Sequence, residues 1–187
     1  FPSDLNDDFL KGFQLLEKYN LSYDNWSPDF SRLPRLAELA NQFPAVTVIV
    51  NHLGGRIDPD ADASEISAWQ AAIDSVAACP NTVMKLGGAQ MRVGDWEPPY
   101  HMHRAAAPWH SDTFLATLLP RYQYALEAFG PDRCMFESNF PVDKDCISYR
   151  TLWNLFKKIA KELGLSEAEK TDVFSGTAAR AYRLTAP

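Results

Sequence analysis

VTVIVNHLGG, residues 46–55, decides the fold of this chain. It begins with a run of β-branched residues, which favour a pleated strand. It ends in Gly54 and Gly55, which stop a strand and allow a tight turn. Asn51 and His52 stand between the apolar run and the glycines. The stretch therefore predicts a strand that carries polar side chains at its C-terminal end.

Strand-like and helix-like segments alternate on both sides of this stretch. The expected strands are residues 21–26, 46–55, 81–88 and 133–138. The expected helices are residues 10–19, 31–43, 64–79, 112–129, 148–163, 166–174 and the closing segment 176–184. Alternation of this kind favours an α/β fold with parallel strands. A complete (β/α)8 TIM barrel has eight strands in about 250 residues. We therefore expect residues 1–187 to be a single domain, the C-terminal half of a TIM-barrel-like fold, with about four βα units.

Composition narrows the function classes. The chain has 187 residues, 46% of them hydrophobic, and a net charge of −6 without a basic run, so we expect no nucleic-acid partner. No apolar run is long enough to predict a membrane span. No glycine-rich phosphate loop follows a strand, which disfavours nucleotide binding. Three widely spaced cysteines, Cys79, Cys134 and Cys146, indicate reduced thiols and a cytoplasmic protein. The chain begins with Phe1 rather than Met, so it could be a trimmed or partial product.

Polar residues collect at the C-terminal ends of the expected strands, the edge where parallel α/β folds build their sites. His52 is the strongest single candidate, because imidazole can ligate a metal, move a proton or polarise a carbonyl. The alternative is a structural histidine bonded to a neighbouring loop. Because side chains alternate along a strand, His52 should share its face with Val46, Val48 and Val50.

Five other strand-end residues are candidates. Glu137 and Lys85 could form a general acid–base pair or a buried ion pair that also involves Asp24, because buried charges need partners. Asn139 shares its expected face with Glu137. Trp26 is a candidate wall of the substrate pocket, and we assign Asp24, Lys85 and Trp26 to substrate binding.

Residues 89–110 form a long irregular segment, which in a compact domain is typically functional or disordered. It contains His101-Met102-His103, an HxH pair of the kind that ligates metals on a rigid strand. Here the pair lies in a proline-rich segment, so a lid or a solvent-facing loop is the alternative. We keep His103 as a substrate-binding candidate and assign no metal ligand.

Several motifs together resemble the amidohydrolase 2 family of metal-dependent TIM-barrel hydrolases, which is related to sugar-lactone and pyrone-dicarboxylate lactonases. They are VTVIVNHLGG, NTVMKLGG, AFGPDRCMFESNFPVDK, LWNLFKKIAKELGLSEAEK and FSGTAARAYRL. The resemblance implies that His52 matches a histidine at a barrel strand end that binds metal or substrate. It also implies that Asn139 stands where the wider family, in a pattern like FGSDWP, has an aspartate that acts as base or metal ligand.

The resemblance also sets expectations for cofactor and function. The HxH pair of the family's first strand is absent from this sequence, so we expect no metal to be bound by this chain alone, although a complete family member could hold a zinc-like divalent metal. We expect a hydrolase that acts on a lactone or a related carboxylic ester or amide, with a small-molecule carboxylate or lactone as substrate. The alternatives are a decarboxylase of the same superfamily, or a non-catalytic half-barrel that needs a partner, either a second copy or the missing N-terminal half.

The stretch ESNFP, residues 137–141, indicates roles for Asn139 and Glu137. An amide cannot hold a proton near neutral pH, so Asn139 should orient a substrate carbonyl or a water rather than act as base. Glu137 is expected to be a structural partner of Lys85, the alternative being a base displaced by two residues. Asp143 is expected to cap the next segment.

Overall fold

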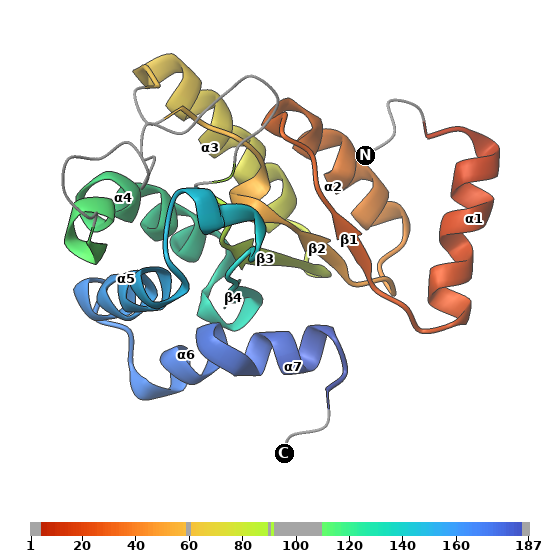
Figure 1. Ribbon diagram of the computed structural model, residues 1–187. Helices are drawn as coiled ribbons and strands as arrows, with labels where there is room; N and C mark the ends of the chain where they lie inside the picture. The colour runs from red at the N-terminus through yellow and green to blue at the C-terminus, as the bar shows by residue number, and fades with distance from the viewer. Residues whose placement is uncertain (1–4, 59–60, 90, 92–109, 185–187) are drawn as a thin grey trace.

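The computed structural model describes residues 5–58, 61–89, 91 and 110–184 (Figure 1). It contains a four-stranded parallel sheet in the order β1 (Tyr23–Asn25), β2 (Val48–Val50), β3 (Thr82–Leu86) and β4 (Cys134–Phe136). The alternating pattern of the sequence is thus confirmed, although the regular ladders are shorter than the expected strands. Within the described residues, β1 and β4 each pair with a single strand.

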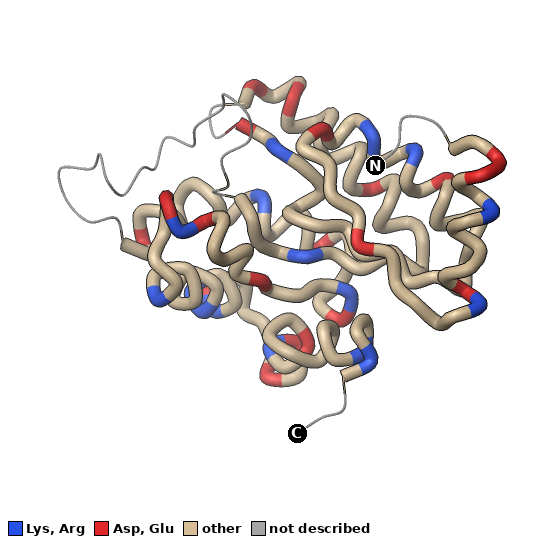
Figure 2. The backbone as a smooth tube through the Cα atoms, turned by 45° about the vertical axis from the view of Figure 1, so that its right-hand side comes forward, with Lys and Arg blue, Asp and Glu red and all other residues tan. Residues whose placement is uncertain are grey.

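Helices cover the sheet (Figure 1). They are α1 (Asp7–Lys18), α2 (Leu33–Gln42), α3 (Ala63–Ala77), α4 (Ser111–Phe129), α5 (Tyr149–Glu162), α6 (Glu167–Thr171) and α7 (Thr177–Ala181). A π-helical turn, Asp172–Gly176, joins the last two. Figure 2 shows acidic and basic residues interspersed along the outer helices. None of the helices described is long and apolar enough to cross a membrane.

The two faces of the sheet have different cores. Val48 and Val50 belong to the large core that α2, α3, α4 and α5 cover. Ile49 points the other way and joins a small cluster with Met135 and Ala181 of α7. The second face is therefore the one that would face the interior of a barrel, and here α7 lies against part of it.

This arrangement corrects the expected orientation of His52. Val46, Val48 and Val50 face the helices, whereas His52 lies with the side chains at the C-terminal edge of the sheet. The strand ends at Val50, and His52 has a φ of 56°. The alternation of side chains holds only in extended backbone, so it does not continue to His52, and the predicted sharing of one face is wrong.

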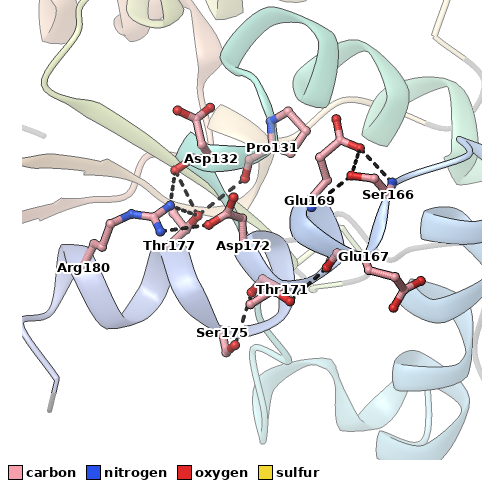
Figure 3. Close-up of polar contacts among 10 residues, drawn as sticks. All are labelled: Pro131, Asp132, Ser166, Glu167, Glu169, Thr171, Asp172, Ser175, Thr177 and Arg180. Atoms are coloured by element: carbon pink, nitrogen blue, oxygen red, sulfur yellow. Dashed lines mark hydrogen bonds and ion pairs between the residues drawn. The ribbon is translucent and has the colours of Figure 1, made fainter. Parts of the chain in front are cut away.

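Side-chain caps and polar contacts fix the C-terminal helices, as Figure 3 shows. A capping box is present at Ser166, with the Ser166 hydroxyl accepting from the Glu169 backbone N–H and the Glu169 carboxylate accepting from the Ser166 N–H. Arg180 donates to Asp172 Oδ1 at 2.8 Å and to the Asp132 carbonyl at 2.8 Å. These bonds tie α7 to the turn that precedes β4. The three cysteines are free and buried, in agreement with the reduced thiols expected.

Candidate active site

His52 lies directly after β2 in a short 3-10 turn, His52–Gly54, with unusual backbone geometry. His52, Leu53, Gly54 and Gly55 all have positive φ, at 56°, 54°, 77° and 134°. Positive φ is uncommon for a residue with a side chain, and such conformations cluster at functional sites. The turn places the imidazole at the C-terminal edge of the sheet.

The imidazole of His52 meets the carboxylate of Glu137. His52 Nδ1 and Glu137 Oε1 are 2.5 Å apart, and the two side chains are only 14% and 21% exposed. The contact is not a hydrogen bond of regular geometry, and neither atom has a hydrogen-bond partner elsewhere in the described part of the chain. A carboxylate beside Nδ1 generally favours the histidine tautomer that carries its proton on that nitrogen, with Nε2 as the acceptor. The predicted pairing of Glu137 with Lys85 is therefore wrong.

Two glycines after β3 make room for this pair. A Cβ on Gly87 would clash with the Glu137 carbonyl oxygen, and a Cβ on Gly88 would lie 2.6 Å from Cγ and Nδ1 of His52. Gly88 also has a φ of 69°, which disfavours any other residue. The sequence marked these glycines only as the stop of a strand. Their close approach to His52 and Glu137 becomes visible only once β2 and β4 are placed on either side of β3.

Asn139 supports Glu137 from the loop after β4. It has a φ of 51°, and its backbone N–H donates to Glu137 Oε2 at 3.2 Å. Its side-chain Nδ2 donates to Asp143 Oδ1 at 2.7 Å. The structure thus brings His52, Glu137 and Asn139 together, as the shared strand-end positions predicted. It adds Asp143, which the sequence identified only as a cap.

A pocket opens beside His52. It is lined by Trp26, His52, Leu53, Ile57, Met91 and Arg121, among others. The Trp26 ring is 6.3 Å from the His52 ring, at 67° to it, and Trp26 is 39% exposed. Arg121 donates to the carbonyl oxygens of Ile57 and Asp58, so its guanidinium is held at the pocket wall. The expected place of Trp26 in the wall of the pocket agrees with this geometry.

Lys85 and Asp24 form a separate pair lower on the same face of the sheet. Lys85 Nζ is 2.7 Å from Asp24 Oδ1, and the Tyr182 hydroxyl donates to the same oxygen at 2.9 Å. Burial alone would lower the pKa of Lys85, but the bonds to Asp24 and Tyr182 outweigh burial and raise it. Burial raises the pKa of Tyr182 to about 12. This is the ion pair with Asp24 that the sequence left open. Neither residue is among the lining residues of the pocket beside His52, and their binding of substrate stays a prediction.

His103, the remaining substrate-binding candidate, lies outside the described residues, as does its neighbour His101.

Comparison with known proteins assigns the family. The family described as Amidohydrolase matches residues 2–184. The chain is 36% identical over 174 residues to an uncharacterised protein of Sinorhizobium fredii, covering 93% of this chain and 51% of that protein. It is 33% identical over 183 residues to an L-fucono-1,5-lactonase of Burkholderia multivorans, covering 96% of this chain and 57% of the relative. The chain therefore belongs to the amidohydrolase family, and it spans about half the length of the curated relatives that it matches.

A solved structure shows the same fold. The crystal structure of an amidohydrolase of Burkholderia multivorans with bound Zn superimposes with a TM-score of 0.79 at 29% identity, covering 96% of this chain and 58% of that one. The four parallel βα units are therefore consistent with one half of a TIM barrel.

The described residues do not make a metal site on their own. No three His, Cys, Asp or Glu side chains come together there in a way that could hold a metal ion. His52 Nδ1 faces Glu137, and position 139 offers an amide, a weaker ligand for a hard cation than a carboxylate. We therefore derive no chemical step through a metal.

Proposed function

We propose that the protein to which this chain belongs hydrolyses a lactone or a related carboxylic ester, with His52 and Glu137 as its proton-transfer pair. The observation that carries the proposal is the 2.5 Å contact between His52 Nδ1 and Glu137 Oε1 beside an open pocket. A histidine held by a carboxylate at one nitrogen and open at the other is the arrangement that general acid–base catalysis uses.

The steps follow from that geometry. Nε2 of His52 takes a proton from a water molecule as the water oxygen forms a bond to the lactone carbonyl carbon. Glu137 stabilises the imidazolium that results. The bond between the carbonyl carbon and the ring oxygen then breaks, and His52 returns the proton to that oxygen. The products are a carboxylic acid and a hydroxyl group on one open chain, and His52 ends in its starting state.

Two groups at the pocket support a small ring with polar substituents as the substrate. Trp26 offers an apolar face on which the carbon face of a ring can rest. Arg121 places a fixed positive charge at the wall, which favours the carboxylate that hydrolysis produces. These features support a lactone of the kind named for the Burkholderia multivorans relative.

The rest of the barrel completes the site in this proposal. The relatives are about twice as long as the part matched here. Further strands would pair with the outer edges of β1 and β4, supplied by more of the same polypeptide or by a partner chain such as a second copy. A zinc ion like the one in the Burkholderia multivorans structure would take its further ligands from that region.

The test uses the full-length gene product and a substrate panel. Sugar lactones are followed by acid release, and hydroxylated aromatic acids by carbon dioxide release. We expect lactone hydrolysis, and we expect His52→Gln to lower kcat by about 1000-fold or more because the proton acceptor is lost. His110→Gln is the matched control, since His110 is an exposed histidine at the start of α4, and it should retain full activity. Carbon dioxide release without lactone hydrolysis, or full activity in His52→Gln, would overturn the proposal.

A further inference from the structure

Asp143 is a carboxylate fully removed from solvent close to the candidate active site. It lies in the 3-10 turn Val142–Asp145 after β4, and it is 0% exposed. A buried carboxylate is retained only where hydrogen bonds or charges compensate its lost hydration. Among its partners is Asn139, whose Nδ2 donates to Asp143 Oδ1 at 2.7 Å. This is a short bond to a charged acceptor, the stronger kind of hydrogen bond.

A second bond joins the same two residues. The Asp143 backbone N–H donates to the Asn139 carbonyl oxygen at 3.2 Å. The carbonyl of Asp143 in turn accepts from the N–H groups of Cys146 and Ile147, each at 3.0 Å. Asp143 therefore holds both the backbone and the side chain of Asn139, while the turn that precedes α5 holds Asp143. These contacts support the left-handed conformation of Asn139, with its φ of 51°.

The conformation of Asn139 determines where its N–H points. That N–H donates to Glu137 Oε2 at 3.2 Å, while Glu137 Oε1 meets His52 Nδ1 at 2.5 Å. The Glu137 carboxylate is thus held at both oxygens, by Asn139 on one side and His52 on the other. A change in the Asn139 backbone would turn the carboxylate away from the imidazole.

We infer that Asp143 is a positioning residue of the active site, which acts through Asn139 to fix the Glu137 carboxylate against His52. This inference rests on the proposed function and extends it by giving the buried Asp143 a part in catalysis. Tyr122 of α4 lies within electrostatic range of both carboxylates. Its fully buried hydroxyl has no hydrogen-bond partner in the part of the chain that the structure describes, and burial, then the charges of Asp143 and Glu137, raise its pKa.

Kinetics on the full-length protein provide the first readout. Asp143→Ala should lower kcat on the lactone by about 100-fold, because misplacing a catalytic group by about 1 Å has that effect. KM should change much less, because Asp143 does not line the pocket. Asp143→Asn keeps an acceptor oxygen for the Asn139 amide and should recover most of kcat. Asp145→Ala, an exposed carboxylate of the same turn, is the matched control and should leave kcat unchanged.

The second readout is the histidine ring itself. In ¹⁵N-histidine-labelled protein, the His52 signals are those lost in His52→Gln. We expect wild type to show one protonated and one unprotonated ring nitrogen, and Asp143→Ala to bring the two shifts together. Asn139→Gly, which tolerates positive φ but removes the Nδ2 donor, should do the same and serves if Asp143→Ala does not fold.

Unchanged His52 shifts and unchanged kcat in folded Asp143→Ala would overturn the inference. If wild type hydrolyses no lactone, the proposed function fails, but the His52 shifts still decide whether Asp143 positions the ring.

Discussion

The Lys85–Asp24 pair and the His52–Glu137 pair both reach across an intervening strand. Asp24 of β1 meets Lys85 of β3 over β2, and His52 after β2 meets Glu137 after β4 over the end of β3. In the first pair, Tyr182 adds a second regular hydrogen bond to Asp24, and the backbone is extended. In the second, His52 has positive φ, the crossing point is Gly88, and the contact lacks regular hydrogen-bond geometry.

This difference between the two pairs suggests that they serve different purposes, one in stability and one in function. A regular, fully bonded pair in the middle of a sheet holds strands together and gains nothing from further ligands. A pair at the loop edge, kept in positive-φ backbone beside a pocket, is the kind of arrangement that clusters at functional sites. We therefore propose that the Lys85–Asp24 pair mainly stabilises the fold and that the His52–Glu137 pair serves the chemistry.

The largest effect should come from Glu137→Gln. Loss of the carboxylate removes the charge that fixes the His52 tautomer, so kcat on the lactone should fall by about 1000-fold or more. The melting temperature should change little, because Lys85 is paired with Asp24 rather than Glu137. A large fall in melting temperature with kcat preserved would return Glu137 to a structural role. Glu127→Gln on the outer helix α4 is the matched control.

Gly88→Ala should have the next largest effect. The new Cβ would meet the His52 ring at 2.6 Å, so we expect kcat to fall by about 100-fold as the ring is displaced. Gly164→Ala is the matched control, because Gly164 has a similar φ of 65° and open space around its Cβ position. It should lose about 1 kcal/mol of stability through backbone strain and keep its activity. Equal kinetic effects of the two substitutions would show that strain alone, not the His52 contact, is responsible.

Asp24→Asn should affect the Lys85–Asp24 pair and leave the His52–Glu137 pair intact. It leaves the half-buried Lys85 ammonium with a weaker partner, so the free energy of unfolding should fall by about 1–2 kcal/mol. Because Asp24 does not line the pocket, kcat should stay within about threefold, a change below the 1.4 kcal/mol that a tenfold effect represents. Urea unfolding and steady-state kinetics on the same preparation measure both. A selective loss of kcat would show that Asp24 binds substrate, as first predicted.

Tyr182→Phe should give the smallest effect, and it is visible in the pH dependence of stability. Tyr182 has its pKa raised from 10.0 to about 12, so the folded state keeps a proton that the unfolded chain releases. Its contribution to stability is complete below pH 10 and is lost as the pH rises from about 10 to 12. Removing the hydroxyl should flatten that part of the curve and cost about 0.5–1.5 kcal/mol at neutral pH. Lys85, whose pKa is also raised, should retain part of the slope. An unchanged pH dependence of stability would show that Tyr182 does not contribute to the Lys85–Asp24 pair.

The sequence was sufficient for the four strands and their parallel direction, and it predicted a site at their C-terminal ends. Those features depend on the local sequence pattern, and VTVIVNHLGG contains both the strand and the histidine that follows it. The gathering of His52, Glu137 and Asn139 followed from a general property of parallel sheets.

The partners within the site were beyond sequence reasoning. The pairing of Glu137 with Lys85 was predicted because buried charges need partners, but positive φ at His52 turned the imidazole toward Glu137. Gly88 was read only as a strand stop, because its contact with His52 exists only once β2 and β3 are side by side. Asp143 was read as a cap, because its bond to the Asn139 side chain depends on the fold of the loop between them.

The most direct test of the central claim, that His52 and Glu137 act as one catalytic unit, is a double-mutant cycle on the full-length protein. His52→Gln, Glu137→Gln and the double variant are compared by kcat/KM on the lactone. Residues that act as a unit show strongly non-additive losses. We expect the double variant to be no more than about threefold slower than the slower single variant. Losses that multiply, so that each substitution has the same effect in the presence of the other, would contradict the account.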